Sequence, residues 1–553
     1  MRLPRRAVLA AFAAALALAG AVSGCGGSSG SGSADPATLA PASAPLYASV
    51  AIKPAGGSGG AAMVAARKLT HLAEPYGSVA QTLLASAGGK LEYKRDVAPW
   101  VGERAGVFVT SLGSSTQALR ASSLQGLLQG GLASLPGALG AGGFGAHGTQ
   151  GAIVAQTSDA GAARSFLSKH AGEQGAHAAS YRGVSFELTP SGVAEGLVKN
   201  FAVVGSESGM HAAIDASLGS PSLAHAPGYA PPATDTIVAA YLKPEALAGA
   251  GSSQLGQLFA GAQSATLTAT ATDSQIALSG EIHGSTTAPP LLGAEGAREL
   301  GELPTNSWLA AGVGDTGRNL PRALGLLQSV ASLATSTVFA SFGGPSIERI
   351  FKLLASPQAK LQQDFAPWAG AGGMFVAGSG LLNLQAGLVI ASKDPAASRA
   401  AVAKLGALMR QAGALVAPAS ISGTDAALSV KLTGFPAEIF IADGAGKFVL
   451  GLGQQSVEAA ISPSATLSTS SAYSSAAASL ADRRSRRSSI GGGIEPSLIV
   501  EFPTMLGFLE GLGLTQSPSL ASIVPYLKSL GTLTAGASGN GGVQRYKVVL
   551  GLG

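Results

Sequence analysis

Asp96-Val97-Ala98-Pro99-Trp100-Val101-Gly102 is a seven-residue stretch that returns, 268 residues later in this chain of 553, as Asp364-Phe365-Ala366-Pro367-Trp368-Ala369-Gly370. An apolar segment that starts with glycine follows each version, at residues 106–109 and 373–376. Two of the three tryptophans take the same place in the two versions. Proline favours a turn, and a short apolar run is typical of a buried strand. The sequence therefore predicts, twice, a Pro-Trp turn that leads into a buried strand.

The likeness between the two halves continues in the same order along the chain. Residues 41–50 resemble 304–313, 153–155 resemble 389–391, 201–205 resemble 448–451, and 266–269 resemble 532–535. Self-similarity kept in order over a long stretch indicates a repeated structural unit. We expect two tandem homologous domains, at residues 39–290 and 301–553, with a junction at 284–302.

Each copy is expected to be an α+β domain, a largely antiparallel sheet with packed helices. Asp159 and Asp394 are expected to begin the helix that follows the second strand, because an aspartate at the N-cap accepts bonds from otherwise unpaired N–H groups. Pro395 fits the first helical turn. Apolar runs predict strands in the first copy at 46–52, 106–110, 152–156, 184–188, 201–205, 236–242, 264–271 and 275–282, and in the second at 308–313, 373–377, 388–392, 427–432, 447–452, 497–502, 532–537 and 543–550.

Two strand pairs are expected in each copy. In the first copy residues 184–188 are expected to pair with 201–205, and 264–271 with 275–282 through a turn at Asp273-Ser274. In the second copy residues 427–432 are expected to pair with 447–452, and a glycine-rich turn at 539–542 is expected to join the last two strands, 532–537 and 543–550.

The copies differ in two segments. The first carries a Gly/Leu-rich insertion at 111–151, in which Leu124, Leu127, Leu128, Leu132 and Leu135 would share one helical face. That face could contact a membrane or an apolar ligand, or pack on its own domain. The second copy carries a loop with Arg483, Arg484, Arg486 and Arg487, which could contact anionic headgroups or stay solvated.

The first 24 residues predict an export signal. Arg2, Arg5 and Arg6 precede an apolar run that is too short to span a bilayer, and small residues precede Cys25, the only cysteine in the chain. This layout predicts a lipoprotein signal peptide at 1–24, a diacylglyceryl thioether on Cys25, and a Gly/Ser-rich tether at 25–38. The protein would then be exported and anchored on the outer face of the cell membrane. The arginine pair leaves general secretion and the twin-arginine route both open.

Composition limits the chemistry that is available. Charged residues make up 12% of the chain, about half the usual fraction, and the excess of Lys and Arg over Asp and Glu is only 5. This balance argues against a nucleic-acid partner. With its one thiol used by lipid, the protein would have neither disulfides nor thiolate metal sites.

The Asp-x-Ala-Pro-Trp-x-Gly turn, the start at Pro41 and the leader together resemble the actinobacterial lipoprotein family of domain-of-unknown-function 3352. The resemblance covers most of residues 39–553. It implies an exported protein that is usually held at a membrane. The family has no established activity, so the resemblance implies no site residues.

Few residues in the sequence are candidates for catalysis. Ser58 stands in a Gly-x-Ser-x-Gly pattern that could be a nucleophile elbow, but such a pattern arises easily in a glycine-rich chain and is equally typical of a flexible turn. Asp96, Pro99 and Trp100, with Asp364, Pro367 and Trp368, could form a sugar-stacking site or serve the fold; their presence in both copies favours the fold. The seven histidines show no metal-binding spacing.

The sequence as a whole predicts a lipid-anchored envelope protein without catalysis, cofactor or metal, with a binding or structural role. Its partners would be the membrane and, beyond that, an envelope lipid or another envelope protein. Two alternatives stay open: a carrier of a lipid or another apolar ligand, and a serine hydrolase that uses Ser58.

Overall fold

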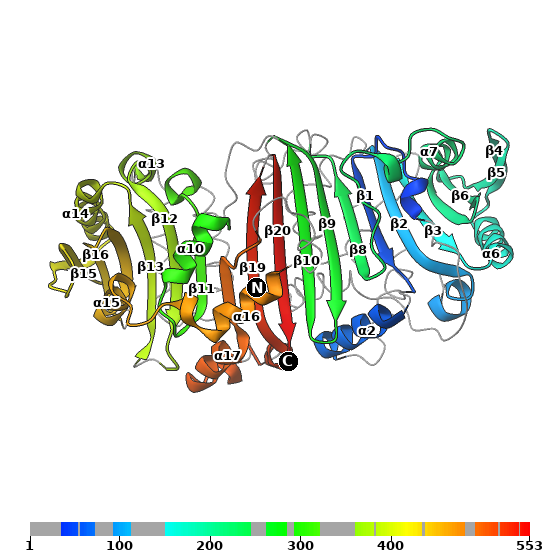
Figure 1. Cartoon of the computed structure of the whole chain (residues 1–553). Helices are drawn as coiled ribbons and strands as arrows, with labels where there is room; N and C mark the ends of the chain where they lie inside the picture. Colours follow the sequence, from blue (N-terminus) through cyan, green and yellow to red (C-terminus); the bar gives the residue numbers. More distant parts are fainter. Residues whose placement is uncertain are drawn as a thin grey trace. The chain divides into compact units, whose positions relative to one another are not determined.

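The computed structural model describes residues 35–53, 56–71, 92–111, 150–244, 261–284, 292–320, 360–380, 383–433, 437–481, 493–517, 520–521, 523–540 and 542–553. The chain divides into two compact units, Met1–Thr287 and Ala288–Gly551. Figure 1 labels the helices and strands of both. Antiparallel strands and covering helices make each unit an α+β structure.

In unit 1 the described elements run from a short 3-10 helix to a long hairpin. They are η1 (Pro36–Thr38), β1 (Leu46–Ala51), α2 (Gly56–Thr70), η2 (Tyr93–Val97), β2 (Val101–Ser111), β3 (Gln150–Thr157), α6 (Ala160–Glu173), β4 (His177–Tyr181), β5 (Val184–Leu188), β6 (Val193–Val198), β7 (Phe201–Ser206), α7 (Glu207–Ser217), η4 (Leu223–His225), β8 (Thr236–Leu242), β9 (Ala262–Thr272) and β10 (Gln275–Gly284).

In unit 2 the described elements begin with a helix and also end with a hairpin. They are α10 (Ala294–Glu302), β11 (Ser307–Val313), α13 (Leu361–Asp364), β12 (Ala369–Ala377), β13 (Gln385–Ser392), α14 (Pro395–Gln411), β14 (Leu415–Pro418), β15 (Ala426–Lys431), β16 (Ile439–Gly444), β17 (Lys447–Leu452), α15 (Gln454–Ile461), η8 (Leu467–Thr469), α16 (Ser471–Leu480), β18 (Leu498–Glu501), α17 (Phe502–Gly511), η10 (Leu514–Gln516), α18 (Val524–Lys528), β19 (Leu530–Asn540) and β20 (Val543–Leu552).

The strands of the two units pair in the same order. Unit 1 runs β4-β5-β6-β7-β3-β2-β1-β8-β9-β10. Unit 2 runs β14-β15-β16-β17-β13-β12-β11-β18-β19-β20. In both units the first strand, β1 or β11, lies inside the sheet between the strand that follows the Pro-Trp turn and a strand from much later in the chain.

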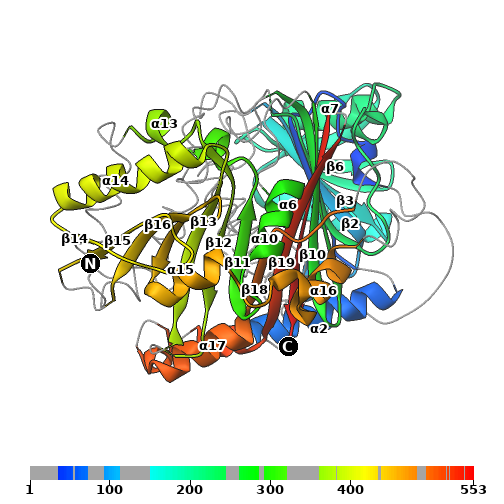
Figure 2. The ribbon, with the colours of Figure 1, turned by 60° about the vertical axis from the view of Figure 1, so that its left-hand side comes forward.

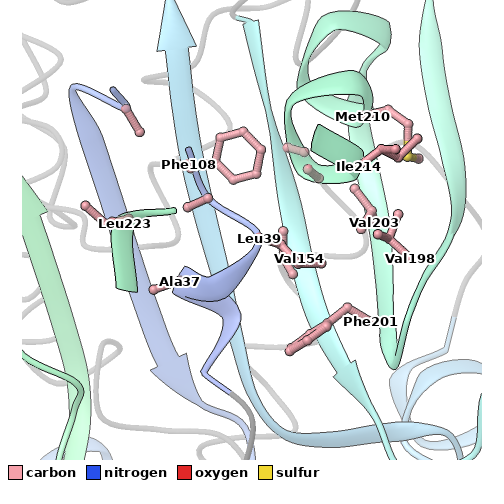
Figure 3. Close-up of a cluster of buried hydrophobic side chains, with 14 of the residues drawn as sticks. Ala37, Leu39, Phe108, Val154, Val198, Phe201, Val203, Met210, Ile214 and Leu223 are labelled. Atoms are coloured by element: carbon pink, nitrogen blue, oxygen red, sulfur yellow. The ribbon is translucent and has the colours of Figure 1, made fainter. Parts of the chain in front are cut away.

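Helices cover both faces of each sheet. In unit 1, α7 packs on the face that carries Val198, Phe201 and Val203 (Figure 3), whereas α6 packs on the face that carries Leu197 and Ala202. Unit 2 repeats this arrangement: α14 covers Ile441 and Phe448, and α15 covers their neighbours on the other face (Figure 2). Successive residues of a strand point to opposite faces, which is why both faces can be apolar.

The aspartate caps form as the sequence indicates. Asp159 accepts a bond from Ala162 N at 2.9 Å and begins α6. Asp394 accepts bonds from Ala396 N and Ala397 N at 3.0 and 3.1 Å and begins α14, with Pro395 in its first turn. The hairpin of β9 and β10 turns at 273–274, also as expected.

Four of the described strands are not predicted from the sequence: β4, β6, β14 and β16. The expected pairing of 184–188 with 201–205 is therefore wrong, because β6 lies between β5 and β7. The expected pairing of 427–432 with 447–452 is wrong for the same reason, because β16 lies between β15 and β17. Strand β4 carries exposed polar side chains at the edge of its sheet, and β6 contains Glu195 and Gly196. Neither segment has the apolar run on which the prediction depended.

The proposed correspondence of Phe201 with Phe448 is wrong by one residue. Phe448 lies opposite Ile390, whereas Phe201 lies opposite Gln156. Relative to the capping aspartates, Ile390 takes the place of Ala155, and Ala155 lies opposite Ala202. Phe448 thus takes the place of Ala202, on the other face of the sheet from Phe201, because a shift of one residue along a strand reverses its faces.

Two expected boundaries also differ. Residues 35–38, which were assigned to the tether, are folded, and Pro36 and Ala37 in η1 are buried. Helix α10 occupies residues 294–302 of the expected 284–302 junction, because its apolar face, with Ala297 and Leu300, is buried against β11 and β12.

Candidate functional sites

The two Pro-Trp turns have the same geometry. Trp100 Nε1 donates to the backbone carbonyl of Asp96 at 2.7 Å, and Trp368 Nε1 donates to that of Asp364 at 2.8 Å. Both indoles are buried, Trp100 beside Phe166 and Trp368 beside Phe365 and Phe448. Pro99 and Pro367 precede them in the turns. Because the rings are covered by their own units, this arrangement serves packing and leaves no ring face for a sugar.

The carboxylates of the two turns have different partners. Asp96 accepts a hydrogen bond from Arg95 Nε at 2.8 Å and another from Glu92 N at 2.8 Å. The bond from Arg95 is the largest cause, followed by the bond from Glu92, that lowers the pKa of Asp96 to about 2. Asp364 instead accepts from Lys404 Nζ of α14 at 2.6 Å. Only the backbone part of the motif is common to both turns.

A histidine of α6 contacts a buried glutamate of β6. His170 Nδ1 lies 3.1 and 3.0 Å from the two carboxylate oxygens of Glu195, whose side chain is only 2% exposed. Phe166 stacks on the imidazole with ring centroids 5.9 Å apart. The hydrogen bond with Glu195 is the main cause that raises the pKa of His170 above its usual value. The charged imidazolium is therefore the favoured partner of this carboxylate.

Unit 2 buries a carboxylate under the corresponding helix, α14. Ser398 Oγ donates to Asp443 Oδ2 at 2.6 Å, and the Asp443 side chain is 2% exposed. Arg399 Nε lies 4.0 Å from Asp443, and Arg399 NH2 bonds to Asp425 at 2.8 Å. Burial raises the pKa of Asp443 above its usual value. The Asp443 carboxylate is thus buried with a hydroxyl, while the one guanidinium nearby is mainly bonded to Asp425.

The two polar pairs occupy complementary positions in the shared topology. On the helices, counted from the capping aspartates, His170 corresponds to Leu405 and Ser398 corresponds to Ala163. On the strands, matched by their pairing partners, Glu195 corresponds to Ile441 and Asp443 corresponds to Leu197. Where one unit has a polar pair, the other has an apolar pair in its core. The fold therefore requires neither pair. Sequence reasoning missed both, although a lone acid at an inward-facing position of an apolar strand is a signal that could have found them.

A third polar group lies at the start of unit 1. The Asp35 carboxylate accepts from Tyr229 Oη at 2.7 Å and from Tyr47 Oη at 3.3 Å, and Tyr47 is fully buried. Arg104 extends from β2 and donates to Thr236 O and Ser49 Oγ. Arg104 is turned inward, where burial lowers its pKa.

A surface pocket of about 440 Å³ lies in unit 2, on the connection between β14 and β15. Its lining combines polar and small side chains: Ala419, Ser420, Ile421, Ser422, Thr424, Asp425, Ala426 and Ala427. The hydroxyls and Asp425 suit a small polar ligand better than an acyl chain.

Several residues singled out in the sequence lie outside the described residues. These are Cys25, the five leucines of the insertion (Leu124, Leu127, Leu128, Leu132, Leu135) and the four arginines (Arg483, Arg484, Arg486, Arg487). Ser58 lies in the first turn of α2, which begins at Gly56, so the backbone forms neither the expected flexible turn nor an elbow between strand and helix. Helix α2 buries Ala62, Ala65, Ala66 and Leu69 on one side, and this packing extends the helix into a glycine-rich start.

The described residues form neither a metal centre nor a membrane-spanning helix. No three His, Cys, Asp or Glu side chains come together there as metal ligands. No described helix has the length and apolar character needed to cross a bilayer.

The fold and these sites define an α+β protein with two units of equal strand order and internally paired buried carboxylates. Residues 7–485 match the model of a family described as "Protein of unknown function (DUF3352)", and the chain belongs to this family. No curated protein matches the chain.

Solved structures give only a weak likeness. "Structure of crystal form III of TP0453" is 12% identical with a TM-score of 0.24, and covers 47% of this chain and 84% of that one. "Structure of crystal form I of TP0453" is 10% identical with a TM-score of 0.23, and covers 47% and 82%.

Proposed function

We propose that this protein is a lipid-anchored envelope protein of two duplicated domains, with a binding or structural role and no catalysis. The observation that carries the proposal is the place of Cys25, directly after an export-type leader and ten residues before Asp35, the first described residue. Ten residues span at most about 35 Å. Acyl chains on Cys25 would therefore hold unit 1 close to the membrane surface.

The shared strand order supports duplication. It extends over the entire sheet of each unit and includes the aspartate caps and both Pro-Trp turns. Two further contacts recur: Leu223 N donates to Ala40 O, and Leu467 N donates to Leu303 O. Such agreement in detail favours two copies of one ancestral domain.

A structural or binding role accounts for the polar groups that the structure describes. The carboxylates of Glu195 and Asp443 are used by partners within their own units, and the Trp rings are covered. The pocket at 419–427 is the described place where a small polar ligand would fit. The lipid-carrier alternative depended on the insertion at 111–151, and the hydrolase alternative on an elbow at Ser58; no described contact favours either.

Metabolic labelling tests the anchoring. The full precursor would be expressed in its native host with labelled palmitate, beside Cys25→Ser and, as a matched control, Ser28→Ala. We expect label in the native chain and in Ser28→Ala, with loss of label and release from membranes in Cys25→Ser. Equal membrane retention of Cys25→Ser would overturn the proposal.

A further inference from the structure

The segment at 35–45 crosses unit 1 before the first strand begins. Its apolar residues Ala37, Leu39, Ala40 and Ala44 are at most 1% exposed, and Leu39 lies with Phe108 and Leu223 in the core (Figure 3). Backbone bonds hold it along its length: Ala42 N donates to Pro221 O, and Leu223 N donates to Ala40 O. From Ala37 onward the segment is thus part of the core.

The beginning of this segment is held differently. The side chain of Asp35, directly before η1, is held by the Asp35 cluster, which we define as Asp35, Tyr47 and Tyr229. Tyr229 reaches Asp35 across 194 residues of sequence and packs edge-on against Tyr47, with ring centroids 5.9 Å apart. Asp35 also accepts from Ala37 N at 3.0 Å and so begins η1. One carboxylate joins the first turn of the fold to two tyrosines from distant parts of unit 1.

Unit 2 has no such cluster among its described residues. Ala310 takes the place of Tyr47: each lies opposite a core phenylalanine, Phe375 or Phe108, in the neighbouring strand. On its other side Ala310 faces Ile499, whereas Tyr47 faces Tyr241. The tyrosine cluster is thus present in unit 1, the unit nearer to Cys25, and is absent from the same place in unit 2.

We propose that the Asp35 cluster is the fixed point at which the lipid-anchored N-terminal chain joins the folded protein, an inference that rests on the proposed anchoring. Among the described residues, Asp35 is the first that a pull from the anchored end would reach. The charged acceptor, bonded by two hydroxyls and one amide, holds that end against η1. Without the cluster, Asp35 would keep only its bonds within η1, and the first residue held by packing would be the buried Pro36.

Amide hydrogen exchange on the full mature chain tests this. The variants are Asp35→Ala, which removes the shared acceptor, and Tyr229→Phe, which removes its shortest hydroxyl bond. Tyr241→Phe is the matched control, because Tyr241 lies in the same aromatic group but donates to Pro227 O and not to Asp35. We expect exchange at residues 37–39 to rise about tenfold in Asp35→Ala and severalfold in Tyr229→Phe, with no change in Tyr241→Phe.

The amides of Ala42 and Leu223 report on the rest of the segment. They should stay protected in all three variants, which shows that unit 1 remains folded. Unchanged exchange at 37–39 in both Asp35→Ala and Tyr229→Phe would overturn the inference, and so would an equal rise in Tyr241→Phe.

Comparing the lipid-anchored form with a Cys25→Ser form separates this inference from the proposed function. The cluster should protect residues 37–39 in both forms. Missing palmitate label with a normal exchange pattern would refute the anchoring alone. Normal labelling with an unchanged pattern in the variants would refute the role of the cluster alone.

Discussion

The indole of Trp368 closes the turn before β12 through its bond to the Asp364 carbonyl at 2.8 Å, and its ring is only 1% exposed. Trp368→Phe keeps an aromatic ring but leaves that carbonyl without its donor. We expect unit 2 to lose about 1–3 kcal/mol of stability. Urea unfolding followed by circular dichroism, with hydrogen exchange of β12 and α14 to localise the change, measures it. An unfolding midpoint equal to that of the native chain would contradict this role of the indole.

The buried pair Ser398 and Asp443 should respond strongly to single changes and weakly to a double change. Ser398→Ala leaves a buried carboxylate without its hydroxyl donor, at an expected cost of about 1–3 kcal/mol. The double variant Ser398→Ala with Asp443→Leu installs the pair that unit 1 has at Ala163 and Leu197. Since apolar replacement of a buried polar pair is often neutral or stabilising, we expect it to recover most of the loss.

A double-mutant cycle by urea unfolding gives the coupling between the two residues. Additive losses in the cycle would show that Ser398 and Asp443 do not act as a pair. The pH dependence gives a second measure. Burial raises the folded-state pKa of Asp443 above its unfolded value, so the native chain should lose stability as pH rises from about 4 through that raised value, and the double variant should lose this contribution.

His170 should make the stability of unit 1 depend on pH near neutrality. Its folded-state pKa is raised by Glu195, so the stabilisation is complete below about pH 6.5 and is lost as pH rises through the raised value. Urea midpoints at several pH values between 5 and 9 should show this loss in the native chain and not in His170→Gln. His177→Gln, on the exposed edge strand β4, is the control and should keep the native dependence. The same pH profile in His170→Gln and the native chain would refute this assignment.

Two glycines of unit 1 should respond in opposite ways to alanine. A Cβ on Gly209, in the first turn of α7, would collide with the carbonyl oxygen of Gly151 in β3, so Gly209→Ala must separate helix and strand. Gly172, in α6, has nothing within 4 Å of the same position, and Gly172→Ala should stabilise the helix by up to about 1 kcal/mol. Thermal unfolding measures both. A Gly209→Ala variant as stable as the native chain would show that α7 is not held this tightly.

The sequence was most informative where a local rule acts. The Asp159 and Asp394 caps, the Trp strands and the β9–β10 hairpin follow from residue chemistry within a few positions. Strands β4 and β6 follow instead from long-range pairing, which brings a polar edge segment and a glutamate-containing segment into a sheet. No apolar period marks them.

The sequence marks the lone acid of each buried pair but not its partner, because the pairing depends on the register of a strand. Glu195 meets His170 only because β6 is placed beside β7, with Glu195 opposite Val204 and on the same face as α6. A prediction that aligns Phe201 with Phe448 assigns the side chains of the neighbouring strands to the wrong faces of the sheet. The resulting error is one residue in sequence but a full reversal of which side chains meet.

The position of β1 between β2 and β8 has a consequence for how the protein acquires its structure. Leu46 pairs with both Val109 and Leu242, so one neighbour follows soon in the chain and the other almost 200 residues later. Strand β11 has the same arrangement between β12 and β18. Such contacts of high sequence separation slow folding, because a long loop must close before they form. Each sheet is therefore completed only after nearly its whole unit has been made.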